Sequence, residues 1–133
     1  MADAALSIGE RFGAYDAASA AAEESLGIRR GLADVLGTPG SRRDLSVSLN
    51  NVGRVAESRG DWAAAGRAYE ESLGIARDLA DSLGTPEFLH DLVISPDNLA
   101  GVVEQLGDAE RAESLRAERD HIAEILDSRP SET

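Results

Sequence analysis

The sequence predicts an all-α fold built from stacked, antiparallel helical hairpins. A stretch of 47 residues occurs twice in succession, because residues 23–69 and 70–116 align without a gap and share 23 identical positions. Apolar side chains recur every three or four residues, as on one face of an α-helix, and no stretch shows the alternation of a strand. The chain is therefore expected to be a stack of about three hairpins with a 47-residue period.

Six helices are expected. Their approximate ranges are 3–12, 14–36, 40–59, 62–83, 87–106 and 109–127. Met1 aligns with Ser48 in the repeat, so the first unit begins late and its leading helix has about half the usual length. Connections of a few residues force consecutive helices to lie antiparallel and in contact.

A single domain is expected over residues 1–128, because the whole chain of 133 residues has the length of one domain. The repeat divides this domain into units at about 1–36, 40–83 and 87–127. Residues 129–133 are expected to form a disordered tail.

The middle unit shows the helical spacing most clearly. The apolar stripe of its first helix consists of Leu45, Leu49, Val52 and Ala56. The stripe of its second helix consists of Trp62, Ala65, Tyr69, Leu73, Ala76, Ala80 and Leu83. Gly60-Asp61 separates the two stripes and predicts a tight turn.

Glycine and proline mark the helix ends. Gly84 follows the last residue of a stripe and is expected to adopt the left-handed C-cap conformation. Thr85-Pro86 comes next, with threonine as a plausible N-cap and proline at the first helical position, where no N–H is needed. Thr38-Pro39 repeats the same arrangement one unit earlier.

The last unit departs from this pattern in two ways. Pro96 lies in the interior of the helix expected at 87–106, where proline costs about 3 kcal/mol. A kink, or a fresh helix start with Ser95 as N-cap, is therefore expected there. Arg116 and Arg119 replace a tyrosine and a serine of the middle unit, so the last helix is expected to be a polar cap.

Charge and cysteine content argue against several classes of function. The chain has 13 basic residues, all arginine, against 25 acidic ones, and its net charge of -12 repels phosphate backbones and anionic membrane surfaces. It has no cysteine, no run approaching the roughly 18 apolar residues of a membrane span, and no pattern of a secretory signal in its first twenty residues. We expect a cytoplasmic protein that binds neither nucleic acid nor membrane.

No cluster of residues predicts a reaction, a cofactor or a metal site. The two histidines, His90 and His121, lie on different expected helices. His121 and Glu124 share a helical face, but a di-iron site needs this motif twice together with two further glutamates. The glycine-rich segment 37–41 lacks the lysine of a phosphate loop. We therefore expect a protein that is not an enzyme and holds no cofactor or metal.

Counted from Ser46 as the first position, the middle unit has large, small and aromatic residues in a definite order. They are Leu49, Val52, Gly53, Ala56, Gly60, Asp61, Trp62, Ala65, Tyr69 and Leu73. This order resembles the tetratricopeptide repeat, in the long-helix form found in tandem arrays of high-GC bacteria, although the period exceeds the usual 34 residues. The resemblance implies an α-solenoid whose paired helices cross closely at small residues such as Gly53.

In such a solenoid the first helix of each hairpin lines a concave groove that holds peptides. The expected groove residues are Val47, Asn50, Asn51, Arg54 and Glu57 in the middle unit and Ile94, Asp97, Asn98 and Glu104 in the last. Asparagine amides pair with a peptide backbone, and an arginine takes a carboxylate. The acidic members favour a neutral or basic partner.

A second candidate surface is a rim patch around the turn at Gly37. It consists of Arg29, Arg30, Arg42 and Arg43. Asp34 and Asp44 are near enough to neutralise much of its charge. This patch is a candidate contact for an acidic partner.

The sequence therefore predicts a protein-interaction scaffold or adaptor that binds a partner peptide or helix in the concave groove. Two alternatives remain open. One is a self-association module, such as a homodimer, formed through the exposed edges of a short stack. The other is a regulatory fragment of a larger multi-domain protein.

Overall fold

The computed structural model describes the backbone of residues 2–129 and the side chains of residues 17–129. Within this part of the chain all regular structure is α-helical and no strand is present, which confirms the predicted all-α class. Residues 130–133, most of the predicted tail, lie outside the described residues. The helices are α1 (Ala2–Leu36), α2 (Pro39–Ser58), α3 (Trp62–Leu83), α4 (Pro86–Gln105) and α5 (Ala109–Asp127).

One predicted helix boundary is wrong. The helices expected at 3–12 and 14–36 form the single continuous helix α1. The turn between α2 and α3 uses Gly60, with a φ of 75°, and Asp61, whose carboxylate caps α3. Ala14 stands 47 residues before Asp61 and has no side-chain oxygen to cap a new helix, so the alanine-rich segment continues as a helix.

The two Gly-Thr-Pro connections have the predicted geometry. Gly37 and Gly84 both adopt a φ of 59°, in the left-handed region. Thr38 caps α2 through a reciprocal pair of hydrogen bonds with Ser41. Thr85 takes the same position before α4 but makes no side-chain hydrogen bond to the helix. The reciprocal bond is impossible there, because a phenylalanine stands in the place of Ser41.

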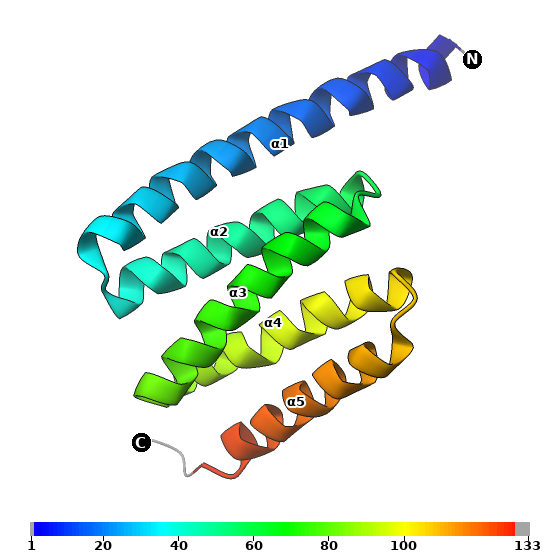
Figure 1. The fold of residues 1–133 in the computed structure, drawn as a ribbon. Coiled ribbons are helices and arrows are strands. Elements are labelled where there is room, and N and C mark those ends of the chain that lie inside the picture. The colour runs from blue at the N-terminus through cyan, green and yellow to red at the C-terminus, as the bar shows by residue number, and fades with distance from the viewer. Residues whose placement is uncertain (1, 130–133) are drawn as a thin grey trace.

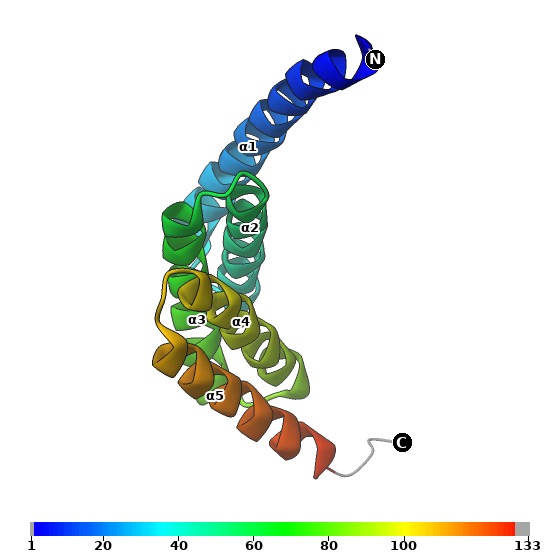
Figure 2. The same cartoon turned by 90° about the vertical axis from the view of Figure 1, so that its right-hand side faces the viewer.

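The helices pack in chain order, each against the next. Figure 1 shows them as a row of rods that runs from α1 to α5 with alternating direction. Seen from the side, the row has two layers and is bent, with α2 and α4 on the inner side and α1, α3 and α5 on the outer side (Figure 2). Because α2 and α4 also touch directly, the inner side presents two neighbouring helices.

The hydrophobic core extends from α2 to α5. Its largest fully buried side chains are Tyr69, Leu49, Leu73, Leu99 and Val102. Trp62 packs against the edge of this core, as the sequence predicts. No side chain of α1 between residues 17 and 36 is buried, so α1 is the least buried member of the row.

Helix α4 passes through Pro96 without interruption, so the fresh helix start predicted at Ser95 is wrong. Ser95 and Pro96 are both almost completely buried. Tertiary packing therefore outweighs the cost of about 3 kcal/mol that proline brings to a helix interior. The Ser95 hydroxyl has no hydrogen-bond partner within the described residues.

Helix α5 forms the polar end of the row. Its buried residues are Ala112 and Leu115. The sequence predicts a polar capping helix from Arg116 and Arg119. Both side chains form ion pairs with carboxylates of α4. These ion pairs join α5 to α4.

Candidate partner-binding groove

A hollow of about 190 Å³ lies between α2 and α4 on the inner side of the bend. It is lined by Arg43, Ser46, Val47, Asn50 and Arg54 of α2 and by Asp91 and Ile94 of α4. Arg43, Val47, Asn50 and Arg54 are spaced by three or four along the helix and share one face, and Ser46 lies at the edge of that face. The hollow therefore follows the two inner helices along the line where they meet.

Two of the residues that line the hollow have exposed apolar side chains. Val47 is 46 % exposed and Ile94 is 47 % exposed, although both are large and aliphatic. They stand 47 residues apart, at the same position of successive units. The repeat therefore places one apolar anchor on each inner helix.

One of the residues that line the hollow has an unsatisfied polar atom. The side-chain oxygen Oδ1 of Asn50 is buried and has no hydrogen-bond partner in the described part of the chain. One repeat later, Asp97 takes the place of Asn50 and forms an ion pair with Arg119 of α5. Asn50 has no such partner, because the counterpart of Arg119 on α3 is Ser72, which bonds to Ser46. A buried acceptor without a partner costs about 1–3 kcal/mol. A ligand N–H would recover that cost by donating to this oxygen once the Asn50 side chain turns toward the hollow.

An arginine stands at each end of the hollow. Arg43 donates to the Asp91 carboxylate from Nε at 2.7 Å and from Nη2 at 3.2 Å, and to Glu87 from Nη1 at 2.7 Å. Arg54 donates to Oδ1 of Asn51 at 3.0 Å. Because Asn51 is neutral, the charge of Arg54 is not balanced by any ion pair that the described residues provide.

Three carboxylates of the predicted groove are held by the outer helices. Glu57 accepts the hydroxyl of Tyr69 at 3.1 Å, and Asp97 and Glu104 form ion pairs with arginines of α5. None of the three lines the hollow. Each of the three carboxylates therefore has a partner within the chain.

The predicted groove and the observed hollow share four residues, Val47, Asn50, Arg54 and Ile94. Asn51 is exposed beside the hollow, and Asn98 has a buried Nδ2 without a hydrogen-bond partner but does not line it.

Sequence reasoning missed Ser46 and Asp91 and placed Arg43 on another surface. Extending each inner helical face by one turn toward its N-terminal end would have included Arg43 and Asp91, because residues three or four apart are neighbours on a helix.

The predicted rim patch does not form a free basic surface. Each of its four arginines makes an ion pair with a different part of the chain. The pairs are Arg29 with Asp44, Arg30 with Glu71, Arg42 with Asp78, and Arg43 with Glu87 and Asp91. The patch therefore serves to join α1 and α2 to their neighbours.

Among the residues with described side chains, no group of three or more histidine, aspartate and glutamate side chains is arranged to hold a metal ion. The helices that the structure describes also include none with the length and apolar character needed to cross a bilayer. Comparison with known protein families, with curated proteins and with solved structures finds no match for this chain.

Proposed function

We propose that the protein is a non-catalytic interaction scaffold that binds an extended peptide segment in the hollow between α2 and α4. The 47-residue repeat, the alternating direction of the helices and the bend toward α2 and α4 support a tetratricopeptide-like solenoid. The observation that carries the proposal is the buried, unpartnered Oδ1 of Asn50, a residue that lines the same hollow as the exposed side chains of Val47 and Ile94.

An extended peptide matches the chemistry of this hollow. A backbone N–H of the peptide would donate to Oδ1 of Asn50, whatever the sequence of the peptide. An apolar side chain of the peptide would pack against Val47 and Ile94. A cavity of about 150 Å³ holds a benzene molecule, so a hollow of about 190 Å³ has room for one large side chain.

The partner segment is neutral in this proposal. Arg54 would repel a cationic side chain placed in the hollow, and a carbonyl or carboxylate oxygen is the group it binds best. A strongly acidic partner would be repelled by the net charge of -12. An uncharged segment with one aromatic or branched aliphatic residue satisfies both conditions.

Selection of displayed peptides on the full-length chain tests this proposal. Peptides selected on the wild type should bind at least tenfold more weakly to Val47→Asp, because a carboxylate would replace the apolar anchor. Asn50→Leu should weaken the same peptides, because it removes the acceptor. It should not lower stability, because the lost oxygen has no partner in the folded chain.

A matched control is Leu83→Asp. Leu83 is 43 % exposed, close to the 46 % of Val47, but it lies at the end of α3 and does not line the hollow. Equal loss of binding in both aspartate variants would show a general charge effect and contradict the groove. A stable dimer in sedimentation that buries Val47 would also contradict a free peptide site.

A further inference from the structure

An apolar stripe on α1 is exposed to solvent. It consists of Ile28, Leu32, Val35 and Leu36, which are 57 %, 42 %, 82 % and 58 % exposed. Their spacing of four, three and one residues places them on one helical face. A contiguous exposed stripe of this kind marks an interaction surface.

Part of the same face of α3, one unit later, is buried, whereas Ser82 and Leu83, the counterparts of Val35 and Leu36, are exposed. Leu79, 47 residues after Leu32, is 3 % exposed. Ser72, 47 residues after Ser25, is buried, and its hydroxyl lies 2.8 Å from that of Ser46 on α2, whereas Ser25 is exposed. The Ser72–Ser46 bond shows that α2 covers this face of α3. No helix of the described chain takes the equivalent place on α1.

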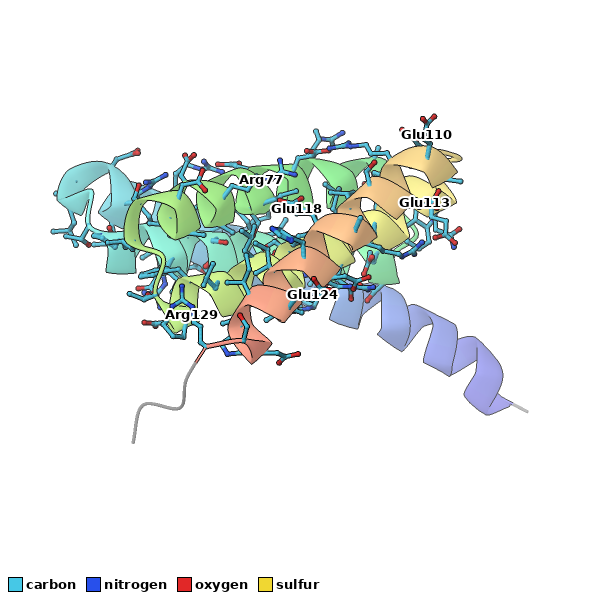
Figure 3. The ribbon with its side chains drawn as sticks, turned by 90° about the horizontal axis from the view of Figure 1, so that it is seen from below. Arg77, Glu110, Glu113, Glu118, Glu124 and Arg129 are labelled. Carbon is cyan, nitrogen blue, oxygen red and sulfur yellow. The ribbon has the colours of Figure 1, made fainter. Side chains whose placement is uncertain are left out.

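An ion pair repeats with the same period and joins alternate helices. Arg30 of α1 donates to Glu71 of α3 at 2.6 and 3.1 Å, and Arg77 of α3 donates to Glu118 of α5 at 2.9 and 2.7 Å (Figure 3). Both arginines and both glutamates stand 47 residues apart. Glu24, 47 residues before Glu71, is exposed and forms no ion pair with any side chain that the structure describes.

Helix α5, at the other end of the row, lacks the apolar surface and the arginine that would join it to a further helix. Helix α5 keeps Leu126 at the place of Leu79, and this side chain packs against the core. On the other face, Asp120 and Asp127 replace Leu73 and Ala80, and Glu124 replaces Arg77 (Figure 3). The apolar surface for a following helix and the ion-pair series therefore both end at α5. Within the described residues, only the α1 end exposes an apolar face whose counterpart on α3 is partly buried.

We propose that this face of α1 binds a helical hairpin with the sequence pattern of residues 27–58. The second helix of the hairpin covers Leu32 with leucines spaced four apart, as Leu45 and Leu49 are on α2. Its first helix offers an arginine to Glu24, as Arg30 does to Glu71. The site is separate from the hollow between α2 and α4 and does not depend on it.

A second copy of the chain fits this face less well. A head-to-tail contact would bring α5, with Asp120, Glu124 and Asp127, toward Glu24, and like charges repel. It would also place one outer-layer helix against another, whereas an inner-layer helix covers the equivalent face of α3. Pairing of two α1 helices remains an outcome that the experiment detects.

The test uses the full-length chain and a fluorescent synthetic peptide of residues 27–58, which need not be folded when free. We expect saturable binding with a Kd below about 1 mM, because ordering the peptide reduces its affinity. Leu32→Arg should weaken binding at least tenfold. The control is Asp34→Arg, at an exposed α1 position that points about 200° away from Leu32 around the helix, and it should bind the peptide normally.

A charge exchange tests the orientation of the hairpin. Glu24→Arg should weaken binding by up to about fivefold, as an exposed ion pair is worth at most about 1 kcal/mol. A peptide with its Arg30 changed to Glu should restore binding to that variant. Three results would overturn the proposal: no binding at millimolar peptide, equal binding to Leu32→Arg, or a wild-type dimer that Leu32→Arg dissociates.

Discussion

At the scale of single residues, the packing of α2 on α3 depends on the absence of a side chain at Gly53. A Cβ atom placed there would lie 2.4 Å from the ring of Tyr69. Tyr69 is 1 % exposed and its hydroxyl is bonded to Glu57, so the ring has little room to move. One unit later Ala100 replaces the glycine and Arg116 replaces the tyrosine. The pair therefore changes together, as steric exclusion requires.

We expect Gly53→Ala to lower the free energy of unfolding by about 1–3 kcal/mol, because overpacking outweighs the gain of about 1 kcal/mol in helix propensity. Gly74→Ala is the control, since nothing lies within 4 Å of its added Cβ atom and the full propensity gain should appear. Urea denaturation measures both. Equal stabilisation of the two variants would show that the Tyr69 ring moves aside at little cost in free energy.

Tyr69 should also make stability depend on pH under alkaline conditions. Burial, followed by the nearby Glu57 carboxylate, raises the pKa of the Tyr69 phenol well above its usual value near 10. Above pH 10 the unfolded chain loses this proton while the folded chain keeps it. The free energy of unfolding should therefore fall by up to about 1.4 kcal/mol per pH unit.

Denaturation of the wild type and of Tyr69→Phe between pH 8 and pH 11 measures this contribution. The phenylalanine variant should be less stable at pH 8, because it loses the bond to Glu57, and its stability should fall less steeply above pH 10. Parallel curves for the two proteins would show that Tyr69 ionises freely in the folded state.

At the scale of helices, repeated positions have different energies because their neighbours differ. Leu79→Ala should cost about 2–4 kcal/mol, because it leaves a cavity at a site that is 3 % exposed. Leu32→Ala makes the same change 47 residues earlier, at a site that is 42 % exposed, and should cost less than about 1 kcal/mol. Similar losses in thermal denaturation would show that α1 is covered in solution.

Proline in α4 gives a second test at this scale. Pro96→Ala should restore a helical hydrogen bond to the Leu92 carbonyl and relieve a penalty of about 3 kcal/mol, while losing part of the buried ring. We expect a net gain of about 1 kcal/mol in the free energy of unfolding. A loss of stability would mean that packing of the ring is worth more than the hydrogen bond.

For the whole molecule, burial predicts the order in which the helices open. Helices α3 and α4 supply much of the core, and each packs on at least two other helices, whereas α1 has no buried side chain between residues 17 and 36. Native-state hydrogen exchange should therefore show the slowest exchange in α3 and α4 and the fastest in this part of α1. Binding of the hairpin peptide should slow exchange there, whereas uniform protection without ligand would contradict this order.

The sequence by itself determined the helical class, the 47-residue period and the connections. These follow from local chemistry, such as the positive φ of Gly37 and Gly84 and the caps at Thr38 and Asp61. Val47 and Ile94, whose side chains are exposed, were also expected at this surface, from the positions that the tetratricopeptide resemblance assigns to the groove. The break expected near residue 13 was wrong, because Ala14 lacks the side-chain oxygen with which Asp61 caps α3.

Only the tertiary structure decided which charges are free. Glu57, Asp97 and Glu104 bond to the outer layer, and Arg43 reaches across to Asp91, because helices distant in sequence bring these side chains together. The tertiary structure likewise showed that Asn50 lacks a partner and that α1 lacks the cover that α2 provides for α3. Helical spacing determines on which face of its helix a residue lies, whereas the partners of its side chain depend on how the helices pack.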